Sequence, residues 1–142
     1  MNNWIYKGQD YIEPSKENVG FCYLITCLIN NKKYYGKKLF WKHIVKPPLK
    51  NTTKKRKSIV QSDWLNYFGS SEALKNDIEL YGYENFKREI IYLCESKSEM
   101  SYYEAKLQFD NDVLFRDDFY NGIINLRVKR CKTLKKRVDK DS

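Results

Sequence analysis

The chain has 142 residues and a formal net charge of +9, and 42% of its residues are hydrophobic. This length predicts one domain with a small core. No run of 18 apolar residues is present, and the first residues lack a signal-peptide pattern, so neither a membrane span nor export is expected. The four cysteines form no Cys-x-x-Cys pair and there is one histidine, which excludes a structural zinc site. We expect reduced thiols and a cytoplasmic location.

The charges are segregated along the chain. Residues 32–57 hold eleven Lys and Arg and no acid, residues 58–126 hold six cations and thirteen acids, and residues 127–142 hold eight cations and two acids. A protein that needed only solubility would mix its signs, so this pattern favours a polyanion as partner. A solvated basic surface is the alternative. A membrane surface is not expected, because neither basic segment forms an amphipathic helix.

The first element with a clear pattern is residues 20–38. Apolar residues alternate on both sides of an Asn-Asn pair, which predicts a β-hairpin with a two-residue turn. Because side chains alternate along a strand, this register puts Tyr23, Tyr34 and Lys38 on one face around the bare backbone of Gly36. Two phenols and an ammonium group there would surround a phosphate. The alternative is an ordinary hairpin whose tyrosines pack into a core.

Three other segments flank or interrupt the predicted domain of residues 20–126. Residues 1–19 are mixed in character and read as an N-terminal extension packed on the core. Residues 39–61 hold two prolines between basic runs and predict a long basic loop, which we expect to become ordered on nucleic acid. Residues 127–142 are basic and poor in apolar residues, and predict a flexible tail.

Two helices and a third strand follow the basic loop. Ser71 and Gly82 are the cap and the stop of the first helix. Residues 85–94 read as a strand, and a Ser-x-x-Glu capping box at 96–99 opens a helix that runs to about Asp110. A hairpin is not stable alone, so the third strand should join it. The predicted fold class is α+β, with a small three-stranded antiparallel sheet flanked by helices.

Glu104 in the second predicted helix is a candidate functional residue because of its apolar surroundings. It lies at the edge of an apolar stripe formed by Met100, Tyr103 and Leu107. A carboxylate in such a place is costly unless it is paired or binds a cation. Two interpretations remain open: a surface ion pair with a lysine, or an oxygen ligand for Mg²⁺ with water at the other positions.

The spacing of the two tyrosines resembles a family signature. Phe21-Cys22-Tyr23, followed eleven residues later by Tyr34-Tyr35-Gly36, resembles the motif of the GIY-YIG nucleases. Small free-standing phage-encoded homing-type endonucleases look closest. The resemblance covers roughly residues 20–125, with Phe21 and Cys22 in place of the first glycine and isoleucine. Two further stretches match: Gly69-Ser70-Ser71, in which glycine replaces a histidine, and Tyr120-Asn121-Gly122.

The resemblance implies a reaction and a set of residues. The reaction is hydrolysis of phosphodiester bonds in DNA, which we expect to be double-stranded, with Mg²⁺ or Mn²⁺. Tyr23 would act as general base or orient the water, and Tyr34 would support the water or the phosphate. Glu104 would hold the metal, and Asn121 would position Glu104 or the metal's waters. The family also has an arginine on a helix after the second motif, and Arg56 is its expected counterpart. A neighbouring lysine, His43, Arg88 or Arg116 could fill the same role.

Lysines near these positions are expected to assist. Lys37 and Lys38 would favour a phenolate and bind nucleic acid, because nearby positive charge lowers the pKa of a phenol. Lys54, Lys55 and Lys57 would contact phosphates. A non-catalytic nucleic-acid-binding module explains the same charges and aromatic residues, and is the main alternative. A ribosome-like structural protein fits less well, since residues 58–126 are acidic.

Overall fold

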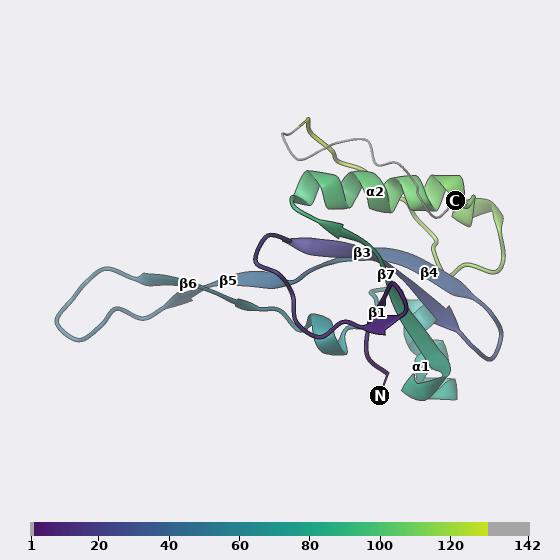
Figure 1. The fold of residues 1–142 in the computed structure, drawn as a ribbon, viewed down its shortest axis with the longest axis horizontal. Helices are drawn as coiled ribbons and strands as arrows, with labels where there is room; N and C mark the ends of the chain where they lie inside the picture. Colours follow the sequence, from purple (N-terminus) through teal and green to yellow (C-terminus); the bar gives the residue numbers. More distant parts are fainter. Residues whose placement is uncertain (1, 131–142) are drawn as a thin grey trace.

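The structure is a computed structural model, and it describes residues 2–130. Two α-helices lie on opposite faces of a five-stranded sheet, and a two-stranded arm extends away from this body (Figure 1). Helix α1 spans Glu72–Tyr81 and helix α2 spans Lys97–Asp110. Three single-turn 3₁₀ segments complete the helical structure of the described residues: η1 (Trp64–Asn66), η2 (Tyr83–Asn85) and η3 (Val113–Phe115). Within residues 2–130, no helix has the length and apolar character that a bilayer crossing needs.

The main sheet is larger than the sequence predicts. Its order is β2 (Gln9–Asp10), β1 (Ile5–Tyr6), β7 (Phe86–Cys94), β3 (Gly20–Cys27) and β4 (Lys33–Leu39). The expectation of three antiparallel strands is therefore wrong, because β1 runs parallel to β7 and makes the sheet mixed. Strands β1 and β2 have two residues each and are joined by Lys7 and Gly8, which both have positive φ angles. Such short strands show no alternation in sequence, so the pattern could not reveal them.

The hairpin of β3 and β4 has a longer turn than predicted. A loop of residues 28–32 joins the strands, and Asn31, at φ 61°, donates its backbone N–H to the Cys27 carbonyl at 2.9 Å. Tyr23 consequently pairs with Gly36, where the two-residue turn would have paired it with Lys38. The strands slide by two residues, which keeps each side chain on its face. The two tyrosines of the signature thus lie closer along the sheet than the predicted register allows.

One face of the sheet carries the larger core, which α1 covers. Trp4, Phe21, Tyr23 and Trp64 are almost completely buried there with Leu74 of α1. Ser71 caps α1 by accepting a hydrogen bond from the Leu74 backbone N–H at 3.3 Å, as predicted. The N-terminal extension contributes Trp4 to this core, so it is part of the packed body.

Arg88 on β7 is a buried cation in the same core. It is 1% exposed, and its guanidinium group lies against the rings of Trp4 and Phe68. It donates hydrogen bonds to the carbonyl groups of Asn2, Leu65 and Tyr67. Burial lowers the pKa of Arg88 to about 10. Arg88 therefore ties the N-terminus and the segment after η1 to the sheet.

The other face of the sheet is covered by α2. Cys22, Cys94, Met100 and Tyr103 form a second, smaller core between them. The helix begins after Ser96, whose Oγ accepts a hydrogen bond from the Glu99 backbone N–H at 3.1 Å. The helix predicted from the capping box is thus confirmed, and so is its end at Asp110.

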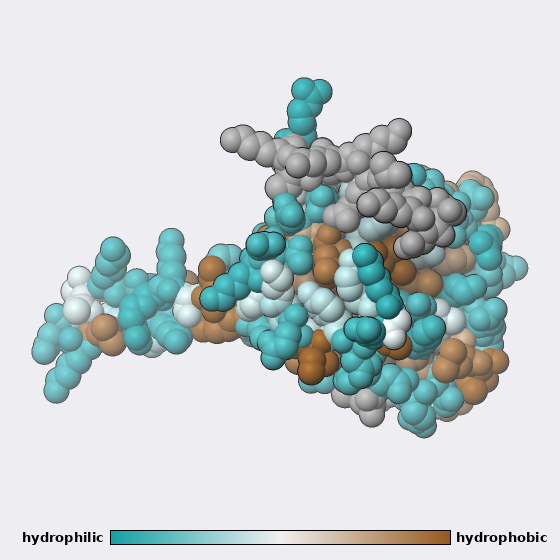
Figure 2. All heavy atoms as spheres, in the orientation of Figure 1, coloured by the Kyte–Doolittle hydropathy of each residue, from teal (hydrophilic) through white to brown (hydrophobic). Residues whose placement is uncertain are grey.

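The segment expected to be a basic loop is mostly a β-ribbon. Strands β5 (Trp41–Lys46) and β6 (Arg56–Gln61) pair antiparallel from Trp41 with Gln61 to Lys46 with Arg56. We call residues 41–61 the arm; it projects from the body and carries a mostly hydrophilic surface (Figures 1 and 2). A loop prediction for residues 39–61 was wrong because the basic residues hide the alternation of apolar residues on each strand. Of the predicted tail, residues 131–142 lie outside the described residues.

Candidate active site

A hollow of about 450 Å³ opens beside the outer strand β4. We call it the Glu104 hollow. It gathers side chains from β4, from the start of α1, from α2 and from the segment after Phe119. Its lining consists of Tyr34, Lys37, Ser70, Ser71, Glu104, Gln108, Asn121, Gly122, Ile123 and Asn125. Three of the predicted site residues, Tyr34, Glu104 and Asn121, therefore meet in one place.

Glu104 faces this hollow from α2. Its side chain is 14% exposed, and one carboxylate oxygen lies 3.8 Å from Lys37 Nζ. Burial raises the pKa of Glu104 above its ordinary value, and the Lys37 charge opposes that rise. Lys37 also donates a hydrogen bond to Ser101 Oγ at 2.8 Å. A mostly desolvated carboxylate with one nearby cation can accept a metal ion in place of that cation.

Tyr34 presents the phenol that is open to the hollow. Its hydroxyl shares a hydrogen bond of 3.1 Å with Ser70 Oγ, at the loop before α1. Burial raises the pKa of Tyr34 above 10.0, while the bond to Ser70 lowers it. Gly69 has a φ of +86°, and a Cβ there would lie 2.9 Å from Leu74 Cδ2 and 3.3 Å from Tyr34 Cε2. Glycine at this position lets the loop pass close to the Tyr34 ring.

Tyr23 lies beneath the surface, next to Tyr34. It is 1% exposed, its ring centroid is 6.2 Å from that of Tyr34, and it does not line the hollow. A Cβ on Gly36 would lie 2.3 Å from Tyr23 Oη. The backbone of Gly36 is therefore not bare, as the sequence suggested: the Tyr23 hydroxyl occupies that space. This contact explains why glycine is needed there.

The expected phenolate is not supported by the surroundings of Tyr23. Burial raises the pKa of Tyr23 well above 10.0, and its neighbours Tyr67, Tyr34 and Glu104 raise it further. The two lysines that were expected to favour ionisation have other partners. Lys37 faces Glu104, and Lys38 lies 2.6 Å from Asp63 Oδ1. Tyr23 is therefore a neutral phenol at ordinary pH.

Asn121 binds the backbone of β4. Its Oδ1 accepts from the Tyr35 N–H at 3.0 Å, and its Nδ2 donates to the Tyr35 carbonyl at 2.8 Å. Next to it, the Tyr120 N–H donates to the Lys33 carbonyl, and the Lys33 N–H donates to the Asp118 carbonyl. Residues 118–121 thus cover the outer edge of the sheet. Asn121 holds the strand that carries Tyr34 and Lys37, and no bond to Glu104 accompanies it among the described contacts.

Gln108 is a residue that the sequence analysis missed. It is 4% exposed and donates from Nε2 to the Tyr35 carbonyl at 3.2 Å, while its buried Oε1 has no hydrogen-bond partner among the described residues. It stands four residues after Glu104 and lines the same hollow. The signal that could have found it is its spacing of four residues from Glu104, which puts the two side chains on the same side of the helix. A buried acceptor without a donor indicates a group that is absent from the structure.

The sequence model described as "Putative endonuclease segE, GIY-YIG domain" matches residues 4–124. The chain belongs to the GIY-YIG endonuclease family. It is also 32% identical over 105 residues to the "Putative endonuclease segD" of Enterobacteria phage T4. The matched region covers 74% of this chain and 38% of that protein. The chain thus spans well under half of the length of that relative. No solved structure matches this chain.

The cationic residues expected to serve this GIY-YIG site are mostly elsewhere. Arg56 lies on the arm, where its Nε donates to the Pro47 carbonyl at 3.2 Å, and it does not line the Glu104 hollow. Arg56 stands in a run of basic residues, so the sequence could not distinguish it from its neighbours. Arg88 is buried in the core, Arg116 pairs with Asp118 at 2.6 Å, and His43 is on β5. Lys37 is therefore the cation of the hollow among residues 2–130.

The lysines expected to bind nucleic acid divide into two groups. Lys54 and Lys55 lie near the tip of the arm and Lys57 lies on β6, all of them exposed. Lys37 and Lys38 lie on β4 and are partly buried, but only Lys37 lines the Glu104 hollow, because Lys38 faces the other side and pairs with Asp63. The arm therefore offers free positive charge at a distance from the GIY-YIG signature.

The oxygen donors of the hollow fit a hard divalent cation. No group of three His, Cys, Asp or Glu side chains that could enclose a metal exists among residues 2–130. The oxygen atoms of its lining residues include the Glu104 carboxylate and Gln108 Oε1, which has no hydrogen-bond partner among the described residues. Mg²⁺ prefers oxygen ligands, keeps several of its waters and is often held by one carboxylate. The residues therefore fit Mg²⁺ or Mn²⁺ and do not fit zinc.

Proposed function

We propose that this chain is a metal-dependent endonuclease that hydrolyses phosphodiester bonds in double-stranded DNA. The observation that carries the proposal is the meeting of Tyr34, Lys37 and Glu104 in one hollow of a chain that belongs to the GIY-YIG endonuclease family. The basic arm, which projects from the body at a distance from this hollow, favours DNA as the polyanion. The host cytoplasm is the proposed place of action.

Glu104 is the residue that would hold Mg²⁺ or Mn²⁺. A bound ion would supply a Lewis acid that polarises the phosphate and stabilises the leaving oxygen. Gln108 Oε1 would accept a hydrogen bond from a water of that ion, which gives this buried acceptor a partner. Lys37, now 3.8 Å from Glu104, would be released toward the substrate. Its ammonium group would then stabilise the charge that grows on the phosphate.

Tyr34 would orient the attacking water or a phosphate oxygen. Because burial raises its pKa, Tyr34 keeps its proton at neutral pH and acts as a hydrogen-bond donor. Ser70 fixes the direction of that hydroxyl. Tyr23 is a positioning residue in this scheme, since it supports the Tyr34 ring from the core. Asn121 keeps β4 in place through the backbone of Tyr35.

The bonds of the reaction define what these groups must do. The water oxygen forms a bond to phosphorus, the bond from phosphorus to the 3′ oxygen breaks, and one proton passes from the water to the leaving oxygen. Neutral Tyr34 does not take that proton, so in this scheme the proton reaches the leaving oxygen through solvent. Lys54, Lys55 and Lys57 on the arm would bind phosphates away from the cleaved bond and raise affinity on all sequences alike.

The test is plasmid cleavage by the wild-type chain and by Glu104→Gln, with Mg²⁺ and with EDTA. We expect wild-type cleavage that EDTA stops, and no cleavage by Glu104→Gln, while retention of DNA in a gel shift is nearly unchanged. Asp110→Asn is the matched control, because Asp110 lies on the same helix and pairs with Lys106 at the surface. Cleavage by Glu104→Gln at the wild-type rate would remove Glu104 from the mechanism.

A non-catalytic DNA-binding module is the second candidate. It is favoured by one observation: no arginine lines the Glu104 hollow among residues 2–130. The same assay separates the two functions. Retention of DNA without nicking, at any excess of wild-type protein with Mg²⁺, would support the binding module and contradict the endonuclease.

A further inference from the structure

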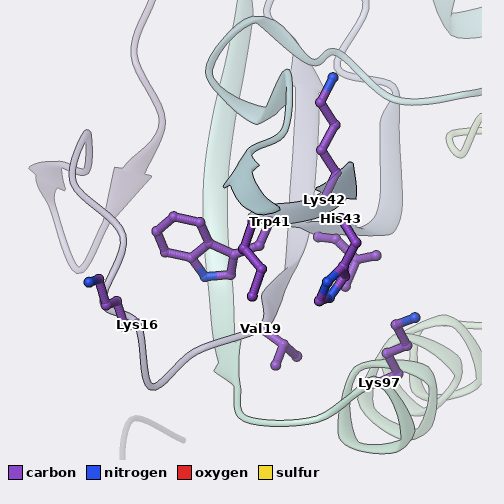
Figure 3. Close-up of a pocket in the computed structure, with 8 residues that line it drawn as sticks. Lys16, Val19, Trp41, Lys42, His43 and Lys97 are labelled. Atoms are coloured by element: carbon purple, nitrogen blue, oxygen red, sulfur yellow. The ribbon is translucent and has the colours of Figure 1, made fainter. Parts of the chain in front are cut away.

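A second hollow lies at the base of the arm, between β5 and the first turn of α2. Its volume is about 630 Å³, and we call it the Trp41 hollow. Figure 3 shows Trp41, His43 and Val19 around it, with Lys16 on one side and Lys97 on the other. Neither the GIY-YIG signature nor the proposed cleavage site includes these residues. Pockets of this volume accept ligands of the size of a nucleotide.

The lining of the Trp41 hollow combines apolar walls with a cationic rim. Val19, Leu39, Trp41 and Ile59 supply the apolar surface, and Ile59 is 61% exposed on the arm. Lys16 and Lys97 stand on its two sides, the Lys42 side chain points away from it (Figure 3), and no acid is present among the described residues that line it. A base needs an apolar face to stack on, and its flanking phosphates need cations. The charge pattern therefore suits a nucleic acid strand better than a neutral or basic ligand.

The indole of Trp41 is held in a fixed orientation. Its Nε1 donates a hydrogen bond to the Asn18 carbonyl at 2.9 Å. The side chain is half-buried, so part of the ring remains accessible. A ring that is already ordered loses little side-chain entropy when a base stacks on it.

The two hollows lie along one line of side chains. Lys37 lines the Glu104 hollow and Leu39 lines the Trp41 hollow, and they stand two residues apart on the same face of β4. On α2, Lys97 lines the Trp41 hollow and Glu104, seven residues later, lines the other. Seven residues of α-helix rise about 10 Å, so the two hollows lie within a few nucleotides of each other along a bound strand.

We propose that the Trp41 hollow is a nucleotide-binding subsite for the DNA strand. One unstacked base of the strand lies against Trp41, and Lys97 and Lys16, on the two sides of the hollow, bind the phosphates on either side of it. The subsite is a few nucleotides from the bond that is cut at Glu104. The position along the strand rests on the proposed function, whereas binding of a nucleotide at Trp41 does not.

Tryptophan fluorescence tests this directly. Trp4 and Trp64 are fully buried, so quenching by DNA reports on Trp41. We expect a short oligothymidylate to quench the fluorescence of the Glu104→Gln chain, and an abasic strand of equal length to quench little. Trp41→Phe should remove the quenching and keep some stacking. Equal quenching by the abasic strand, or none when a gel shift shows binding, would overturn the subsite.

A matched pair of lysines tests the rim. Lys97→Gln should lower the slope of log affinity against log salt by about one for an oligonucleotide, because one phosphate contact is lost. Lys106→Gln, on the same helix but paired with Asp110, should leave the slope unchanged. Equal slopes for the two variants would overturn the assignment of Lys97.

The outcomes also separate this subsite from the proposed function. If the wild-type chain cleaves plasmid DNA but the Glu104→Gln chain shows no quenching of Trp41, the subsite alone is refuted. If quenching is seen but the wild-type chain does not cleave, the endonuclease alone is refuted. Stronger quenching by oligouridylate than by oligothymidylate would overturn DNA as the ligand. Fluorescence that depends on protein concentration without DNA would identify a second copy of the chain as the occupant, and would also overturn the proposal.

Discussion

Gly36→Ala should destabilise the chain, because the new methyl group has no room. An ideal Cβ at residue 36 would lie 2.3 Å from Tyr23 Oη and 2.5 Å from Tyr23 Cζ. The Tyr23 ring cannot move freely, since the rings of Trp4 and Tyr67 pack on it at 5.2 and 6.0 Å. Overpacking of this kind costs about 1–3 kcal/mol. Alanine gains roughly 0.4–1 kcal/mol through the unfolded chain, so a net loss of about 1–2 kcal/mol is expected.

Urea unfolding of Gly36→Ala and Gly122→Ala measures this effect. A Cβ on Gly122 would meet no atom within 4 Å, so Gly122→Ala should be neutral or slightly stabilising. Tyr23→Phe removes the hydroxyl that makes the closest contact, and Gly36→Ala should therefore cost less in that background, by about 0.5 kcal/mol or more. If Gly36→Ala were as stable as Gly122→Ala, the contact between Tyr23 and residue 36 would not exist as described.

Two further predictions concern pH and the edge of the sheet. Burial raises the pKa of Tyr23 above 10.0, so above pH 10 the unfolded chain loses a proton that the folded chain keeps, and stability falls by up to about 1.4 kcal/mol per pH unit. Denaturation between pH 8 and pH 11 should show this slope, and Tyr23→Phe should reduce it; an unchanged slope would argue against a buried neutral phenol. Asn121→Leu leaves the Tyr35 N–H without its partner, while the Tyr35 carbonyl keeps only the bond from Gln108 Nε2, so we expect faster hydrogen exchange at Tyr35 and a loss of about 1–3 kcal/mol. Unchanged exchange at Tyr35 would show that Asn121 does not hold the strand.

Much of the helical structure could be predicted from local signals. Ser71 and Ser96 each place a side-chain oxygen where it accepts a backbone N–H of the first turn, and both helices begin there. These signals depend on neighbours in sequence, so no knowledge of the tertiary fold was needed. The family signature also predicted that Tyr23, Tyr34 and Glu104 would share one site; Tyr34 and Glu104 line one hollow, whereas Tyr23 is buried beneath it.

Features that depend on distant partners could not be predicted. The register of β3 and β4 follows from a loop in which Asn31 has the αL conformation. An Asn-Asn pair is compatible with more than one type of turn, so the sequence did not determine this register. The parallel pairing of β1 with β7 joins residues that lie more than eighty positions apart. The role of Asn121 depends on its contact with the Tyr35 backbone, which the sequence does not show.

The position of β7 has a consequence for how the chain folds during its synthesis. This strand begins at Phe86 and lies between β1 and β3, so both of its neighbours are made long before it. Until the ribosome has released residues 86–94, the inner edges of β1 and β3 have no partner. Assembly of the sheet is therefore a late event that requires distant pairing, which slows folding and leaves unpaired edges open to aggregation in the nascent chain.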